Sequence, residues 1–293
     1  MSVSFEFDLY SDWLSIVKDE LDKVKINTSN LAGDKLSLAY LNLRKKAIRP
    51  IARNVFKSRS FSCLSTHVNG LIKLEKKIEA GDDLTPYLSK SILNPSFHDD
   101  LLNHWGIYHL HLGEVIKDNF VARTGPLLYA RFDENSAYFL DVKEHGAWGQ
   151  QDLVQIIHDN WPQSIFVLRY PDDSKMIYSI TDKDVDKLRK ARINFPVMVN
   201  DGTIYSNLGD GVASNGNNID VVDMMLGIKR KIINWEARVN QGIDEIVKDA
   251  KSKGVSLSGV YELRFDFDGS KAYVFEKNSI FSFELGFLMP DGL

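Results

Sequence analysis

The chain has little of several features that would narrow its class. It contains a single cysteine, Cys63, among 293 residues, so no disulfide can form within the chain and a cysteine-rich zinc site is excluded. No apolar run approaches the length of a membrane span. The formal charge of -4 predicts no general attraction to nucleic acid or to an anionic membrane. We therefore expect a reducing, cytoplasmic location without membrane binding.

The first residues also lack the features of a secretory signal. They read MSVSFEFDLYSDW, with acidic residues where a signal would have a basic region and then an apolar core. Export by that route is therefore not expected. The rest of the composition is ordinary for a globular protein, and the length suits one large domain or two modest ones.

Residues 1–95 are predicted to form a helical region. Apolar residues recur at spacings of three and four in residues 13–24, 35–56 and 67–81. Pro50 interrupts the second run, which indicates two helices or one bent helix around Arg49. Gly81 is a typical C-terminal stop for the third.

Residues 96–200 are predicted to form a central α+β domain. From Leu101 the apolar pattern alternates, and residues 106–113, 126–132 and 137–145 read as three strands of an antiparallel meander. Residues 150–160 are typical of an amphipathic helix that ends before Pro162. Residues 164–170 and 175–181 are predicted to be further strands.

Residues 201–293 are predicted to combine a long helix with a second meander. After a loop rich in Gly, Asn and Ser, residues 219–254 suit one long helix or two behind an Asn cap. Strands are expected at 259–267, 271–277 and 280–287, with a turn at Asp268 and Gly269. The whole chain is thus of the α+β class, and this last part is either a separate domain or continuous with the central one.

Histidines are concentrated in the central region. Six of the seven lie between His98 and His158, and residues 104–111 read HWGIYHLH. Because alternate side chains of a strand share a face, each predicted strand has one apolar and one polar face. If the apolar faces pack on a helical layer, the opposite surface collects His109, His111, Tyr129, Arg131, Asp141, Lys143 and His145.

This set of side chains suits acid and base chemistry on a phosphodiester. Of His109, His111 and His145, one imidazole could take the proton of a ribose 2'-hydroxyl and another could protonate the leaving oxygen. Arg131 and Lys143 could hold the phosphate, and Tyr129 is a further catalytic candidate; no metal or other cofactor would be needed. The ordinary alternative is a polar sheet surface, in which Asp141 pairs with Arg131 across the hairpin.

Metal binding is a second interpretation of the same histidines. The spacing of His109 and His111 suits two ligands on one strand face, and His145 or His158 with Asp141 could complete a zinc or manganese site of a hydrolase. The neighbouring Arg131 and Lys143 would repel a dication, which favours the metal-free interpretation.

A basic stretch suggests a nucleic-acid partner. Residues 35–59 contain eight Lys or Arg and no Asp or Glu. Lys45, Arg49, Arg53 and Lys57 are spaced by four, so one helical face could present a row of charges to RNA or DNA. A solvated surface or a protein partner would explain the same charges, and the protein could then be a binding module without enzymatic activity.

Residues 101–161 combine a predicted helix with a basic meander. A helix is followed by a basic, His-bearing meander with RTGPLLYARF at 123–132 and DVKEHG at 141–146. This segment resembles the core of RelE-like and ParE-like toxins. The resemblance implies RNA cleavage without a metal by basic, aromatic or His side chains on the sheet, in a toxin or phage-defence setting. The chain is much longer than such toxins, so the resemblance implies a core within a larger protein.

Overall fold

The computed structural model describes residues 3–254, 259–268, 271–277 and 282–289. They form two compact units, one of residues 43–220 and one of residues 1–42 with 221–293. Both units combine helices with sheets, which confirms the α+β class. The units differ from the predicted ranges 1–95, 96–200 and 201–293, because the N-terminal strand β1 (Ser4–Glu6) pairs in parallel with β10 (Val260–Asp268) near the other end of the chain.

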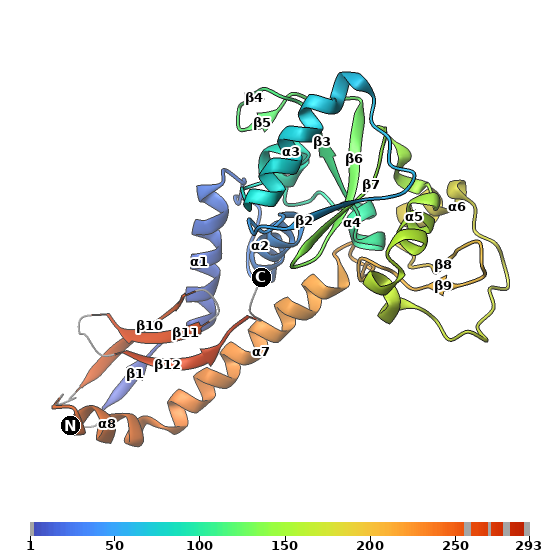
Figure 1. Cartoon of the computed structure of the whole chain (residues 1–293). Helices are drawn as coiled ribbons and strands as arrows, with labels where there is room; N and C mark the ends of the chain where they lie inside the picture. Colours follow the sequence, from blue (N-terminus) through green and yellow to red (C-terminus); the bar gives the residue numbers. More distant parts are fainter. Residues whose placement is uncertain (1–2, 255–258, 269–270, 278–281, 290–293) are drawn as a thin grey trace. The chain divides into compact units, whose positions relative to one another are not determined.

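Unit 43–220 is built on a mixed four-stranded sheet. Its order is β2 (Asn54–Lys57), β7 (Ser136–Glu144), β6 (Pro126–Phe132) and β3 (Tyr108–His111) (Figure 1). The predicted meander of β3, β6 and β7 is present and antiparallel, whereas β2 joins β7 in parallel.

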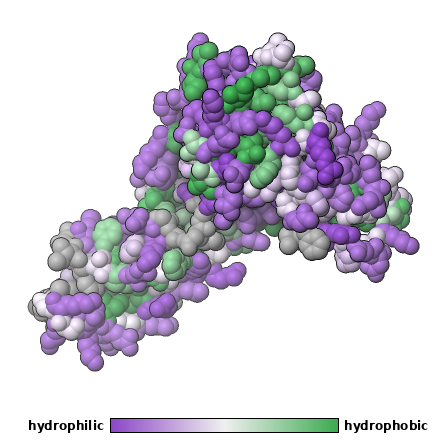
Figure 2. Space-filling model, in the orientation of Figure 1, coloured by the Kyte–Doolittle hydropathy of each residue, from purple (hydrophilic) through white to green (hydrophobic). Residues whose placement is uncertain are grey.

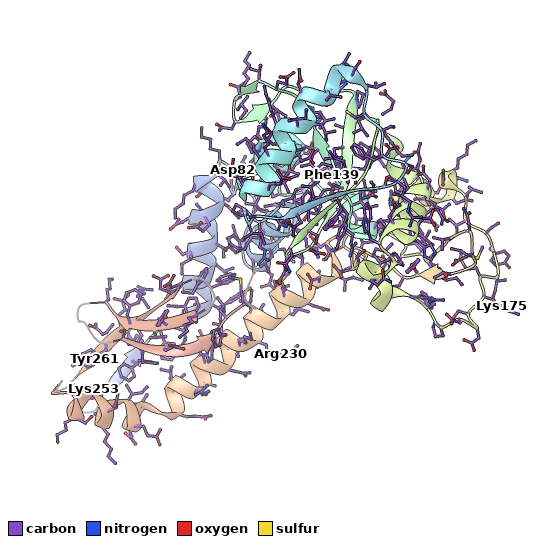
Figure 3. All side chains as sticks on the ribbon, viewed as in Figure 1. Asp82, Phe139, Lys175, Arg230, Lys253 and Tyr261 are labelled. Carbon is purple, nitrogen blue, oxygen red and sulfur yellow. The ribbon has the colours of Figure 1, made fainter. Side chains whose placement is uncertain are left out.

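Both faces of this sheet are covered. On one face α3 (Val68–Ala80) contributes Leu71 and Leu74 to a core with Phe139, which lies in the interior of the unit, whereas Lys175 lies on an outer loop (Figure 3). On the other face α4 (Asp100–Trp105), α5 (Asp152–Asn160) and α6 (Asp182–Lys190) contribute to a second core around Tyr129. The expectation of an open polar face is therefore wrong.

A β-bulge in the hairpin changes which residues share a face. The register shifts so that Tyr129 lies opposite Asp141 while Ala130 lies opposite Phe139. Leu140 then packs in the core that contains Tyr129, and Val142 packs against the opposite core. Strict alternation along the predicted strand would place Leu140 and Val142 on one face, and the structure places them on opposite faces because the inserted residue reverses the alternation.

The rest of the unit consists of short elements. Two-residue strands pair as β4 (Ile116–Lys117) with β5 (Phe120–Val121) and as β8 (Val197–Met198) with β9 (Ile204–Tyr205). Short 3-10 helices are η1 (Ser65–His67), η2 (Thr85–Tyr87), η3 (Lys90–Leu93), η4 (Ala147–Gly149) and η5 (Pro162–Leu168).

Two predicted strands of the central region are wrong. Residues 164–170 fall largely in η5, with one isolated bridge from Arg169 to Tyr205, and residues 175–181 form neither helix nor strand. Short apolar runs do not distinguish a strand from a helical turn, and the tertiary contacts decide between them. The helix α6 that follows begins at a capping box of Thr181 and Asp184.

The predicted helical row of basic residues is not formed. Helix α2 (Asp34–Lys46) ends before Arg49, and Arg53 precedes strand β2, which contains Lys57. Pro50 explains the break, because proline cannot continue the helical hydrogen bonds. Only Lys45 of the predicted row lies on a helix.

The other unit packs helices on one face of a second sheet. Strands β1, β10, β11 (Lys271–Glu276) and β12 (Ser282–Phe287) follow in that order. Phe267 of β10 contacts Trp13 of α1 (Leu9–Lys23), and Phe265 stacks on Trp235 of α7 (Ile219–Gln241), which α8 (Ile243–Ser252) follows. These bounds confirm two helices and a meander.

Two details of this region concern the predicted ends of elements. Asn218 accepts a hydrogen bond from the Asp220 amide, so the predicted Asn cap is present at the start of α7. The predicted turn after β10 lies partly outside the described residues, since Gly269 is not described. The start of the predicted strand 280–287 also lies outside them.

Within the described ranges, no helix is both long and apolar enough to cross a membrane. Hydrophilic residues predominate on the face seen in Figure 2, and hydrophobic residues form small patches between them.

Candidate functional site

A cavity of about 480 Å³ lies within unit 43–220. It is lined by the segment before α4, by strand β3, by the residues after β7 and by α6. The titratable side chains and the tryptophan that line it are His98, Asp99, Asp100, His109, Arg123, His145, Trp148, Asp186, Arg189 and Lys190.

His109 is backed by a carboxylate. Asp99 precedes α4 and one of its oxygens accepts a hydrogen bond from the Leu102 amide, 3.0 Å away, as a helix cap. The other oxygen, Oδ2, lies 3.6 Å from Nδ1 of His109. The cap fixes Asp99, and the chain turns at Gly106 with φ 65° into β3, which brings His109 beside it.

Trp148 contacts two of the three imidazoles that line the cavity, those of His109 and His145. Its ring centroid lies 4.5 Å from that of His109 and 5.0 Å from that of His145. His145 follows β7, and its amide donates to the carbonyl of Gly125 at 3.0 Å. The two histidines therefore reach one space from different strands.

Arg189 is a buried cation at the wall of the cavity. It is 4% exposed, its guanidinium lies 4.2 Å above the ring of Trp105, and Nη1 donates to the Trp148 carbonyl. Nε and Nη2 have no hydrogen-bond partner in the part of the chain that the structure describes. Burial lowers the pKa of Arg189 to about 10, so it remains a cation at neutral pH.

The cavity balances positive and negative charge. Arg123, Arg189 and Lys190 face Asp99, Asp100 and Asp186. Burial raises the pKa of Asp100, while Arg189 acts in the opposite direction. Burial also lowers the pKa of His98, and the charges of Arg192 and Lys46 add to that effect. Protonation of the imidazoles would thus make the cavity cationic.

Two of the six predicted catalytic residues, His109 and His145, line this cavity. His111 lies on the same strand as His109 but is 2% exposed. Its Nδ1 accepts a hydrogen bond from the Thr124 amide at 3.3 Å. Burial lowers the pKa of His111 to about 4, so this imidazole is neutral and structural.

The other three predicted catalytic residues have structural contacts. Tyr129 is fully buried, and its hydroxyl donates to the Glu144 carbonyl at 3.4 Å. Arg131 donates from Nη1 to the carbonyls of Trp105 and Leu208. Lys143 pairs with Asp152 and donates to Gln150 at 3.2 Å. None of the three lines the cavity.

The predicted nucleic-acid-binding residues are engaged within the protein. Lys45 pairs with Asp210 at 2.7 Å, and Lys57 pairs with Glu75 at 2.8 Å. Arg53 is buried and donates to three backbone carbonyls, those of Asp133, Arg49 and Ile51. Arg49 lies 3.7 Å from Glu134. These contacts leave no continuous row of free charges.

The described residues provide no cluster of ligands that would support the metal-site interpretation. Over the ranges that the structure describes, no three His, Cys, Asp or Glu side chains converge as metal ligands would. His158 bonds to the hydroxyl of Tyr205 at 2.7 Å and lies 3.2 Å from Asp201. Asp141 accepts a hydrogen bond from the Ser62 amide at 3.1 Å.

Several cavity residues were not predicted from the sequence. Arg189 and Lys190 lie on α6, a helix that was not expected. A signal for it exists in the sequence, since Thr181 precedes an acidic residue at the third helical position and apolar residues follow at helical spacing. Asp99 and Trp148 have no comparable signal, because only the folded chain brings them to His109.

Comparison of the chain with protein-family models, with curated proteins and with solved structures gives no match.

Proposed function

We propose that the 480 Å³ cavity is the active site of a metal-independent phosphodiesterase that cleaves RNA. The observation that carries this proposal is the pair of imidazoles, His109 and His145, on one tryptophan ring in a cavity with three cationic side chains. The resemblance of residues 101–161 to RelE-like and ParE-like toxins points the same way, and a defence role in bacteria is a prediction that follows from it.

The roles of the two histidines follow from their surroundings. Asp99 lies at Nδ1 of His109, so the opposite nitrogen, Nε2, is available to accept a proton. His109 takes the proton of the ribose 2'-hydroxyl, and the 2'-oxygen forms a bond to phosphorus. The bond from phosphorus to the 5'-oxygen breaks, and His145 gives its proton to that oxygen. The products are a 2',3'-cyclic phosphate and a 5'-hydroxyl.

The cations of the cavity stabilise the charge that develops on phosphate. Arg123 and Lys190 are exposed at its wall, and Arg189 adds a buried positive charge. The Nε and Nη2 atoms of Arg189 are unpaired within the described residues but buried, so this guanidinium acts on the phosphate through its charge. Arg131 and Lys143, predicted for this role, are replaced in the proposal by these three residues.

Cleavage of a random-sequence RNA oligonucleotide in excess EDTA tests the proposal. We expect cleavage by the unmodified protein and a loss of about 100-fold or more in His109→Gln and in His145→Gln, the usual contribution of general acid or base catalysis. The matched control is His67→Gln, because His67 lies outside the cavity and bonds to Thr66. The same oligonucleotide with 2'-deoxyribose throughout should resist cleavage.

Three results would contradict the proposal. Undiminished cleavage in His109→Gln would exclude its role as the base. Cleavage that EDTA abolishes would favour a metal-dependent hydrolase. Binding of the oligonucleotide without cleavage would make the protein a binding module.

A further inference from the structure

A buried lysine lies behind His109. Lys46 is the last residue of α2 and is 8% exposed, and its ammonium donates to the Phe97 carbonyl at 3.1 Å and lies 5.7 Å from the Phe97 ring centroid. Lysine is almost never buried to this extent without a partner of opposite charge. The carboxylate that acts on Lys46 electrostatically is Asp99, the same residue that backs His109.

A second, smaller cavity joins these three residues. Its volume is about 20 Å³, and Lys46, Asp99, Tyr108 and His109 are among the residues that line it. This volume is enough for one water molecule. Nδ1 of His109 is buried and has no hydrogen-bond partner among the described residues, and Asp99, whose Oδ2 lies 3.6 Å from it, lines this small cavity together with Lys46.

We infer that Lys46 is a positioning residue of the candidate active site, acting through Asp99 on Nδ1 of His109 so that Nε2 stays free for the substrate. Asp99 holds one oxygen in the helix cap of α4, so the cation of Lys46 acts on a carboxylate whose place is already set. The catalytic meaning of this inference rests on the proposed function, whereas the coupling of Lys46 to His109 does not.

The charge of Lys46 is itself variable near physiological pH. Burial lowers the pKa of Lys46 to about 8, and Asp99 acts in the opposite direction. The other titratable groups around it are His98, Tyr108 and His109. A change of charge at Lys46 should therefore be visible at the ring nitrogens of His109.

Nitrogen-15 NMR of the histidine rings in the full chain tests the inference. We expect the His109 ring nitrogens to show an inflection near pH 8 in the unmodified protein, at the pKa of Lys46. The inflection should disappear in Lys46→Met and in Lys46→Arg, because arginine does not titrate in this range. The control is Lys45→Met, since Lys45 pairs with Asp210 and Asp220, and it should keep the inflection.

Kinetics of RNA cleavage supply the second readout. Lys46→Met should lower kcat by about tenfold while KM changes little, as expected when a supporting contact of a catalytic group is lost, and Lys46→Arg should recover part of the loss. An inflection absent from the unmodified protein, or one that persists in Lys46→Arg, would overturn the inference. An inflection that depends on Lys46 in a protein that does not cleave RNA would support the coupling and refute the proposed function instead.

Discussion

His109 and His111 are neighbours on one strand, yet their side chains have different chemistry. The side chain of His109 is 12% exposed and lines the cavity, with a carboxylate at one nitrogen. The imidazole of His111 is enclosed, and its Nδ1 accepts a backbone hydrogen bond. An imidazole can act in catalysis only where a substrate reaches it. Burial therefore excludes His111 from catalysis, whereas His109 remains a candidate.

Acid should destabilise the protein through His111. The folded pKa of about 4 lies below the ordinary value of 6.5, so below pH 6.5 the unfolded chain binds a proton that the folded chain does not. The free energy of unfolding therefore falls as the pH drops from 6.5 towards 4, by at most about 3 kcal/mol for this group. His104, whose pKa burial also lowers to about 4, acts in the same direction.

The variant His111→Asn isolates this effect. Its amide oxygen can accept the hydrogen bond from the Thr124 amide, and it does not titrate. Urea unfolding at several pH values between 4 and 7 should show the variant gaining stability relative to the unmodified protein as the pH falls. A difference between the two proteins that stays constant with pH would show that His111 is not a neutral, buried group.

At the scale of elements, a glycine allows α3 to pack closely against the backbone that follows β3. An ideal Cβ on Gly70 would lie 1.8 Å from the Leu112 carbonyl oxygen. Glycine is less favourable than alanine in a helix by up to about 1 kcal/mol, and the close approach of two backbones explains its presence at the third residue of α3. The helix contributes Leu71, Leu74 and Ile78 to the core from this position.

Gly70→Ala should lower the free energy of unfolding by about 2 to 3 kcal/mol, because the added methyl group forces α3 away from the backbone at Leu112. Gly227 in α7 is a matched control, since an added Cβ there meets nothing within 4 Å. Gly227→Ala should raise the free energy of unfolding by up to about 1 kcal/mol. Urea unfolding measures both, and equal effects of the two substitutions would contradict the packing argument.

At the scale of the whole molecule, the two units differ in how the chain builds them. The unit that holds the cavity is one continuous segment, residues 43–220, and contains both cores that cover its sheet. The other unit needs both ends of the described chain, because β1 pairs with β10 and Asp12 accepts hydrogen bonds from Phe265 and Arg264. The unit that holds the candidate site should therefore fold without residues 1–42 and 221–293.

A fragment of residues 43–220 should fold by itself and keep the cavity. We expect dispersed amide resonances, a cooperative urea transition and, for the rings of His109 and His145, the ring-current shifts that Trp148 produces in the full chain. The fragment 221–293 should remain unfolded, since it lacks β1 and Trp13. A disordered fragment 43–220 would show that the site needs the other unit.

The sequence by itself determined the class of the fold and most of the regular elements. Helical spacing, the stop at Gly81 and the Asn cap at Asn218 predicted α3 and α7, and alternation predicted β3, β6 and β7. These signals are local, since periodicity and caps depend on residues a few positions apart. The same alternation identified His109 and His145 as candidates for the site.

Only the tertiary structure decided which candidates share a cavity. The helices on both faces of the sheet removed the expected open surface, and His111 and Tyr129 are buried. The bulge at Leu140 placed Leu140 and Val142 on opposite faces. Asp99, His109 and Arg189 line the same cavity, although Arg189 lies far from the other two in the sequence. Such neighbours depend on which faces are buried against each other, and burial is settled by the packing of distant segments, a property that local patterns do not contain.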